Sequence, residues 1–174
     1  MVLLVIDIQK GITNEGLYNY DEFISNTVRI IETARQNGIE VIFIQHDDGP
    51  GTGFSIGDDA FEIADQVMPM QSEKRYIKVI NSCFGNKEFT TYLESKKEDT
   101  IMVVGLQTNF CIDATIKSAF ERGYKVIVPN GTNSTFDNDY MNKETTYKYY
   151  NEMMWPKRFA ECISMDEAVD LLRK

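Results

Sequence analysis

The stretch Thr100–Asp113, Thr-Ile-Met-Val-Val-Gly-Leu-Gln-Thr-Asn-Phe-Cys-Ile-Asp, decides the fold of this chain. Its apolar run Ile101–Val104 is rich in β-branched residues, which is typical of a short buried strand. Gly105 ends that run, and a helical pattern begins around Phe110. Cys111 therefore lies where a buried strand gives way to a helix, whose free N–H groups and dipole favour negative charge. We expect this thiol to lose its proton easily and to act as a nucleophile, although a small buried core residue would show the same local pattern.

The same change from strand to helix recurs along the chain. Strands are expected at Val2–Ile6, Ile39–Gln45, Tyr76–Ile80, Ile101–Leu106, Lys125–Pro129 and Phe159–Ile163. Helices are expected at Phe23–Ala34, Asp59–Val67, Lys87–Lys97, Phe110–Arg122 and Asn138–Met154, and after a capping box at Ser164–Glu167. This alternation predicts an open, mostly parallel α/β sheet of about six strands with helices on both faces, in one domain spanning residues 1–174.

Composition excludes several classes of function. The net charge is −9, and no cluster of Lys and Arg is present that could neutralise nucleic-acid phosphates. No apolar run approaches the roughly 18 residues that a membrane span needs, and the first residues predict a strand rather than a signal peptide. Cys83, Cys111 and Cys162 are widely spaced and form no CxxC motif, which indicates reduced thiols. We expect a cytoplasmic protein that contacts neither nucleic acid nor membrane.

Chemically active side chains gather at the ends of the expected strands. In open α/β sheets, ligands bind outside the carboxyl ends of the strands. Asp7, His46, Lys78 and Cys111 stand at or near those ends. A lysine in an apolar strand needs a partner, and Asp7 can supply one. Together the carboxylate, the ammonium and the thiol form an acid–base and nucleophile set, whereas each alone would also fit a structural ion pair or a turn cap.

Several motifs carry a resemblance to a known family. They are Leu3–Gln9, Lys78 followed by Asn81–Phe84, Gly105–Cys111, and Asn133–Asp137. In this order they resemble the isochorismatase-like cysteine hydrolase superfamily, over roughly residues 2–137. The resemblance implies a Rossmann-like, three-layer α/β/α fold.

The resemblance also implies roles for the residues at the sheet edge. Cys111 would be the nucleophile, Asp7 the base that activates it, and Lys78 their electrostatic partner. A cis peptide bond would precede Gln107, and the backbone N–H groups of Gln107 and Cys111 would form the oxyanion hole. The implied reaction is cofactor-free hydrolysis of the C–N bond of a small amide through a thioester.

The substrate is less well defined by the sequence. Metal-dependent nicotinamidases of this superfamily carry an Asp and two histidines near the pocket, but this chain has one histidine, so we expect no metal. Isochorismatases proper replace the cysteine, so the chain resembles the amidase-type branch. The candidate substrate-binding residues are Gln9, His46, Phe54, Asn109, Phe110 and Phe136. Each is equally consistent with a packing role or, for His46, with a hydrogen-bonded position in a loop.

Two further expectations remain open. The tyrosine-rich segment Asn138–Trp155 indicates the interface of a homo-oligomer, a dimer or tetramer, or else a cover for the sheet. Cys83 fits either a second thiol of the pocket or a small core residue. The alternative function is a non-catalytic or redox-responsive protein that binds small molecules and retains the fold. A dinucleotide-binding module is excluded, because no Gly-x-Gly-x-x-Gly follows the first strand.

Overall fold

The computed structural model describes all 174 residues, and its centre is a parallel sheet arranged around the first strand. That strand, β1, runs in parallel between β2 and β4, with Leu4 opposite both Ile42 and Val103. The strand order is β3-β2-β1-β4-β5-β7, and β6 pairs with β4 beyond the end of β5. The strands are β1 Val2–Ile6, β2 Glu40–His46, β3 Lys74–Lys78, β4 Thr100–Leu106, β5 Lys125–Pro129, β6 Asn133–Ser134 and β7 Glu161–Ile163.

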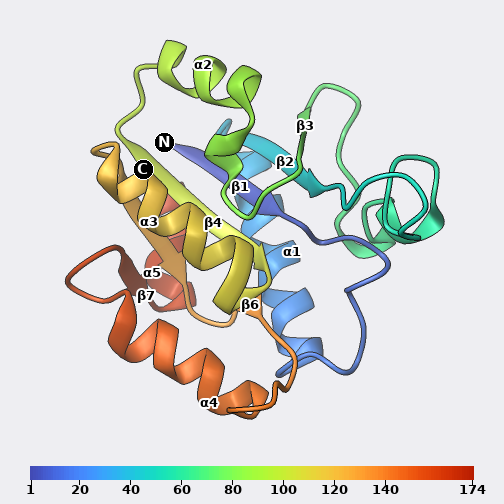
Figure 1. Cartoon of the computed structure of the whole chain (residues 1–174). Helices are drawn as coiled ribbons and strands as arrows, with labels where there is room; N and C mark the ends of the chain where they lie inside the picture. Colours follow the sequence, from blue (N-terminus) through green and yellow to red (C-terminus); the bar gives the residue numbers. More distant parts are fainter.

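Helices cover both faces of this sheet, which confirms the expected three-layer α/β/α fold. In Figure 1, α3 lies in front of the strands with α2 above it and α4 below it, whereas α1 and α5 lie behind the strands. The helices are α1 Tyr20–Gln36, α2 Lys87–Ser95, α3 Asp113–Glu121, α4 Lys143–Lys148 and α5 Met165–Leu172.

Alternation along the central strands divides the core into two layers. Successive side chains of a strand point to opposite faces of the sheet. Leu3 and Val5 of β1 pack with the buried residues of α1 and α5, whereas Leu4 and Ile6 pack with those of α2 and α3. Because both faces of β1 are covered, its continuous apolar sequence is what a central parallel strand requires.

The structure places β3 two residues earlier than the sequence suggested. The strand ends at Lys78, whereas we expected it to continue to Ile80. Val79 and Ile80 are 72% and 54% exposed, so their apolar character does not reflect burial in the sheet. The correction matters because it moves Lys78 from the interior of a strand to its carboxyl end.

Two expected helices are shorter or broken. Asp59–Val67 forms two separate 3-10 turns, Asp59–Phe61 and Asp65–Val67, because Ile63 between them makes an antiparallel bridge with Gln9. The helix expected from Asn138 begins only at Lys143, because the side chain of Asn138 accepts hydrogen bonds from the N–H groups that follow it and forms a turn. The segment after α4, Tyr149–Met154, is a π-helical turn.

Two aromatic residues at the end of the tyrosine-rich region, Tyr150 and Trp155, cover the sheet, whereas Tyr140 and Tyr149 are 94% and 37% exposed. Trp155 is fully buried, and its indole N–H donates to Asp113 of α3 at 2.9 Å. Tyr150 packs against Trp155 with the two rings 5.5 Å apart. Packing therefore accounts for Tyr150 and Trp155 but not for the exposed tyrosines, and the homo-oligomer stays a prediction.

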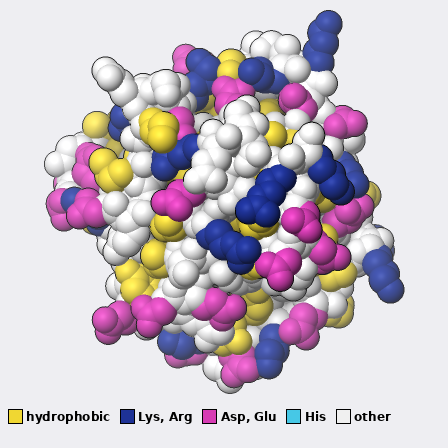
Figure 2. Space-filling model, turned by 180° about the vertical axis from the view of Figure 1, so that it is seen from behind, with side chains coloured by type: hydrophobic (Ala, Val, Ile, Leu, Met, Phe, Trp, Pro, Cys, Tyr) yellow, Lys and Arg dark blue, Asp and Glu magenta, His cyan; other side chains and the backbone are white.

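The outer surface carries charges of both signs. The face seen from behind in Figure 2 intersperses acidic and basic side chains, without a broad basic area. None of the helices combines the length and the apolar composition that crossing a bilayer requires. The expectation that the protein does not contact nucleic acid stays a prediction.

Candidate active site

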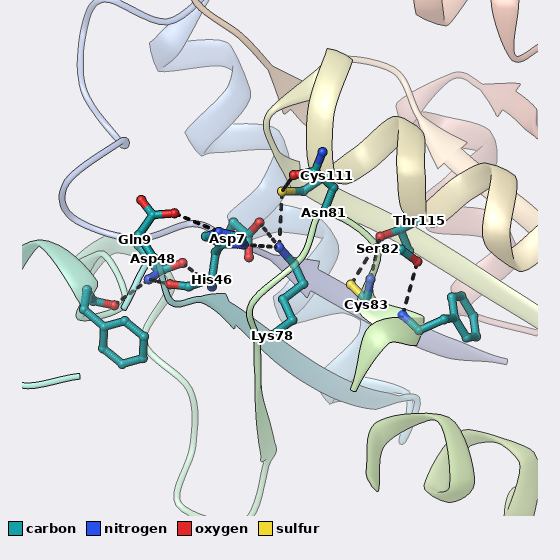
Figure 3. A network of polar contacts seen from close by, with 12 residues as sticks. Asp7, Gln9, His46, Asp48, Lys78, Asn81, Ser82, Cys83, Cys111 and Thr115 are labelled. Atoms are coloured by element: carbon teal, nitrogen blue, oxygen red, sulfur yellow. Dashed lines mark hydrogen bonds and ion pairs between the residues drawn. The ribbon is translucent and has the colours of Figure 1, made fainter. Parts of the chain in front are cut away.

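Four side chains from different strand ends meet at one edge of the sheet. Asp7 follows β1, His46 ends β2, Lys78 ends β3, and Cys111 lies in the turn after β4. His46 and Lys78 are opposite each other in the register of β2 and β3. Figure 3 shows Lys78 reaching between Asp7 and Cys111. The residues that the sequence placed at separate strand ends are thus brought together.

The backbones of β1 and β4 approach each other unusually closely where the two strands end. Asp7 has a φ of 52°, in a region that Asp and Asn adopt more readily than other side chains. Gly105 has a φ of 130°, and a Cβ atom there would lie 2.0 Å from the carbonyl oxygen of Ile6. Only glycine allows this approach, which sets the separation between Asp7 and the turn that carries Cys111.

The turn that carries Cys111 is a π-helical turn, Thr108–Ile112, rather than the start of a regular helix. It follows a cis peptide bond between Leu106 and Gln107. The Thr108 hydroxyl donates to Asn133 Oδ1 at 2.7 Å and so ties the turn to β6. The backbone N–H of Gln107 makes no hydrogen bond within the chain.

Lys78 makes the central contacts of the cluster. Its Nζ lies 2.7 Å from Asp7 Oδ2 and 3.2 Å from Cys111 Sγ. The Asp7 and Lys78 side chains are 2% and 0% exposed, so solvent screens this ion pair little. The second oxygen of Asp7, Oδ1, is buried and has no hydrogen-bond partner. A carboxylate oxygen of Asp7 lies within 4.8 Å of Cys111 Sγ, so Asp7 can act as a proton acceptor close to the sulfur.

His46 extends the cluster toward the surface. Its Nδ1 lies 3.0 Å from Lys78 Nζ, and its Nε2 lies 3.0 Å from Asp48 Oδ1. An ammonium can only donate, so Nδ1 accepts and the proton of a neutral imidazole resides on Nε2, which donates to Asp48. The sequence placed His46 on the pocket wall but did not reveal its contact with Lys78.

The electrostatics correct one expectation from the sequence. Burial and the neighbouring Asp7 carboxylate raise the pKa of the Cys111 thiol to about 12, although Lys78 acts in the opposite direction. Both effects favour the protonated thiol and oppose the thiolate that the helix N-terminus was expected to favour. Burial also raises the pKa of Asp7, with Lys78 opposing. Burial disfavours the Lys78 ammonium, but Asp7 and Cys111 outweigh it and raise the pKa of Lys78.

A cleft of about 290 Å³ opens onto this cluster. Asp7 and Cys111 lie at its base, and the expected residues His46, Phe54 and Phe110 form part of its wall. Its full lining is Asp7, Ile12, His46, Asp48, Phe54, Asn81, Gln107, Phe110 and Cys111. The nucleophile candidate is thus accessible from solvent although Cys111 is only 8% exposed.

Comparison with known proteins identifies the family of this chain. The isochorismatase domain model matches residues 1–167 of the chain. The chain belongs to the isochorismatase family. It is 30% identical to YddQ, an uncharacterized isochorismatase family protein of Bacillus subtilis, over 70% of this chain and 71% of that protein. It is 23% identical to RutB of Yersinia enterocolitica, a ureidoacrylate amidohydrolase, over 93% of this chain and 88% of RutB.

Solved structures of the isochorismatase family share the fold. The crystal structure of one isochorismatase family protein superimposes with a TM-score of 0.85 and 27% sequence identity. The superposition covers 94% of this chain and 97% of that chain. Resemblance to the superfamily, first drawn from short motifs, is therefore confirmed over nearly the whole chain.

The donor set does not fit a metal ion of the kind that some isochorismatase-family enzymes use. Asp7, His46 and Cys111 place their ligand atoms within 4.8 Å of one another. Lys78 Nζ, however, lies within 3.2 Å of all three side chains and fills the centre of the group. A divalent cation there would face an ammonium at contact distance, which is strongly unfavourable. That the site works without a metal stays a prediction.

Three of the expected substrate-binding residues lie outside the cleft. Gln9 is fully buried and holds the backbone of His46, donating to its carbonyl oxygen at 3.0 Å and accepting from its N–H at 2.7 Å. Asn109 accepts a hydrogen bond of 2.6 Å from Thr135. Phe136 packs against the core layer beside α1. Gln9 therefore supports the cleft through the backbone of His46.

Three cleft residues were missed by the sequence analysis. Ile12, Asp48 and Asn81 line the cleft but come from loops whose paths no hydrophobic periodicity predicts. Asn81 had a signal, because it follows Lys78 in one of the family motifs, and its Oδ1 lies 3.8 Å from Cys111 Sγ. Cys83 is fully buried against Thr115 and lies outside the cleft, which agrees with a core role.

Proposed function

We propose that this isochorismatase-family protein is a cysteine hydrolase that cleaves the C–N bond of a small amide. The observation that carries the proposal is the buried contact of Lys78 with both Asp7 and Cys111, at 2.7 and 3.2 Å, at the base of an open cleft. An ion pair that served only stability would need neither the thiol nor the cleft. The grouping instead supplies a nucleophile, a base and a fixed positive charge.

The first half of the reaction forms a thioester on Cys111. Asp7 Oδ1 takes the proton of the thiol as Sγ attacks the amide carbonyl carbon, and the π electrons of the carbonyl move to its oxygen. The free N–H of Gln107 donates a hydrogen bond to that oxyanion. When the oxyanion collapses, the C–N bond breaks, and the leaving nitrogen takes the proton from Asp7. Ammonia or an amine departs.

The second half uses water and regenerates the enzyme. Asp7, again ionised, removes a proton from a water molecule that attacks the thioester. Collapse of this intermediate breaks the C–S bond, and the sulfur recovers its proton from Asp7. Lys78 stays positively charged in both halves, so it stabilises the thiolate and the carboxylate in turn.

The raised pKa values support coupled proton transfer. A carboxyl group with a raised pKa is a stronger base than an ordinary one, and the thiol with a pKa of about 12 needs such a base. Attack and deprotonation then belong to one step. The redox-responsive alternative has less support, because a sensor cysteine is characterised by a low pKa.

The choice of an amide rests on the nucleophile and on one relative. Cys111 allows covalent acyl transfer, which isochorismatases proper do not need. RutB, at 23% identity, is an amidohydrolase. Both points support C–N cleavage.

A panel of small primary amides that includes nicotinamide tests the proposal. We expect at least one member to release ammonia, and we expect Cys111→Ala to abolish that release because no other thiol reaches the cleft. Coupled detection of ammonia under steady-state conditions is the measurement. Cys83→Ala is the matched control, since it removes another buried thiol, one that lies outside the cleft, and should retain activity. A panel without turnover, or turnover that survives in Cys111→Ala, would contradict the proposal.

A further inference from the structure

The charge of the cleft is unbalanced. Asp48 stands in its wall with a side chain 54% exposed, and its one contact with a basic group is the imidazole of His46. No Lys or Arg side chain lines the cleft. The ammonium of Lys78 lies behind the wall, fully buried and paired with Asp7. A ligand in the cleft therefore meets a carboxylate that no fixed cation neutralises.

Two aromatic rings share the cleft with that carboxylate. Phe54 and Phe110 both line it, and Phe110 is 50% exposed although it is a large apolar side chain. The face of an aromatic ring attracts a cation through its quadrupole, and a neighbouring carboxylate adds to that attraction. Aromatic rings beside an unneutralised carboxylate therefore favour a positively charged group and disfavour a negative one.

The loop that carries Asp48 and Phe54 holds them as a unit. The Asp48 N–H donates to the Phe54 carbonyl oxygen at 3.1 Å, which closes the loop. Inside it, Asp47 accepts from the Gly49 N–H at 2.8 Å, and the Thr52 hydroxyl accepts from the Phe54 N–H at 3.2 Å. These bonds fix the backbone from which the carboxylate and the ring extend before a ligand arrives, which lowers the entropic cost of binding.

We propose that the cleft selects amides whose acyl chain ends in a cationic group, such as an ammonium, which lies against Asp48 between Phe54 and Phe110. The inference rests on the proposed hydrolase function and names its substrate class. The His46 imidazole spans the distance from the reacting sulfur to Asp48, because its Nδ1 faces the cluster and its Nε2 contacts Asp48 at 3.0 Å. A chain of a few carbon atoms therefore separates the amide from the charged end.

Three amides of similar length and different terminal charge test the inference. They are γ-aminobutyramide, which is cationic, valeramide, which is neutral, and glutaramate, which is anionic. We expect kcat/KM to be about fivefold to tenfold higher for γ-aminobutyramide than for valeramide, and lowest for glutaramate. Asp48→Asn should remove most of the cationic preference, because the amide keeps an acceptor for His46 Nε2 but loses the charge. The decisive readout is the ratio of kcat/KM values between probes, since a purely structural role of Asp48 would change all three values alike.

A control variant and a binding measurement separate this inference from the hydrolase proposal. Asp21→Asn removes the same charge from the first turn of α1, outside the cleft, and should leave the ratio unchanged. Each probe is also tested for protection of Cys111 from iodoacetamide, which requires no turnover. Protection strongest for γ-aminobutyramide in the wild type, and equal for the three probes in Asp48→Asn, supports the inference even if none is hydrolysed. Equal or absent protection, or a ratio that Asp48→Asn leaves intact, overturns it.

Discussion

Replacing Asp7 with Asn is expected to lower turnover by roughly 10²- to 10⁴-fold, the usual contribution of a general base. The same variant should lower the pKa of Cys111 from its value of about 12, because the Asp7 carboxylate raises that pKa while Lys78, which remains, lowers it. The pKa of the thiol and the turnover rate should therefore both fall: the thiolate becomes easier to form, yet the reaction slows because the base is gone. Alkylation of Cys111 by iodoacetamide as a function of pH, together with steady-state kinetics, measures both effects.

Asn is the appropriate replacement at this position. It has the shape of Asp and tolerates the positive φ of 52° found there, so the backbone of the site is retained. A lower thiol pKa without loss of turnover would remove Asp7 from the role of base. Loss of turnover with an unchanged thiol pKa would show that the carboxylate does not act on the sulfur. A circular dichroism spectrum like that of the wild type controls for folding.

Replacing Lys78 with Met is expected to destabilise the protein by about 3–5 kcal/mol, because Met fills a similar volume but leaves the Asp7 carboxyl buried without its cation. The loss should grow as pH rises. Burial raises the pKa of the Asp7 carboxyl in the folded state, so the folded protein binds its proton more tightly than the unfolded chain does. The resulting stability is present below the ordinary Asp pKa and is lost as the pH rises through the raised folded-state pKa. Urea unfolding at pH 5 and at pH 8 measures this pH dependence of the free energy of unfolding. These pH values lie about one unit and about four units above the ordinary Asp pKa.

Two further variants show whether burial causes that loss. Lys117→Met breaks a bond of the same 2.7 Å length to Asp113, but on a helix surface where the lysine side chain is 35% exposed, so we expect a loss of only about 0.3–0.5 kcal/mol. The double variant Asp7→Asn, Lys78→Met should be more stable than Lys78→Met alone, because it no longer buries an unpaired carboxyl group. A double variant that is less stable than Lys78→Met would contradict the account of the pair.

Much of the site could be predicted from the sequence because a parallel sheet imposes it. The carboxyl ends of parallel strands share one edge, so Asp7, Lys78 and Cys111 had to lie near one another once their strands were recognised. The contact of His46 with Lys78 could not be predicted, because it depends on the register between β2 and β3, in which these two residues are opposite each other. Periodicity identifies strands but does not align an edge strand with its neighbour.

The end of β3 and the existence of β6 could not be predicted, for different reasons. Val79 and Ile80 extend the apolar run of β3, yet they are exposed and lie beyond the sheet. β6 is only two residues long, Asn133 and Ser134, so it has no pattern from which a strand could be recognised. Its position is nevertheless important, because Asn133 holds the turn of Cys111 through Thr108.

The direction of the pKa shift of Cys111 is where the structure departs most from the expectation drawn from the sequence. The position after a strand and before a helix suggested that the helix dipole would lower the pKa of the thiol. Burial and the Asp7 carboxylate act in the opposite direction and outweigh the effect of nearby positive charge. Sequence spacing indicates a helix end, but the exposure of a side chain and its distance from a carboxylate emerge only in the folded structure.

The most direct test of the central claim is to trap the acyl group on the enzyme. The amide of the panel that releases ammonia fastest is mixed with the enzyme, the reaction is stopped with acid within the first turnover, and the peptides are mapped by mass spectrometry. We predict one acyl adduct, on the peptide that carries Cys111, sensitive to hydroxylamine as a thioester is, and absent in Cys111→Ala. Ammonia release by the wild type with Cys111 unmodified, accompanied by full activity of Cys111→Ala, would contradict the account.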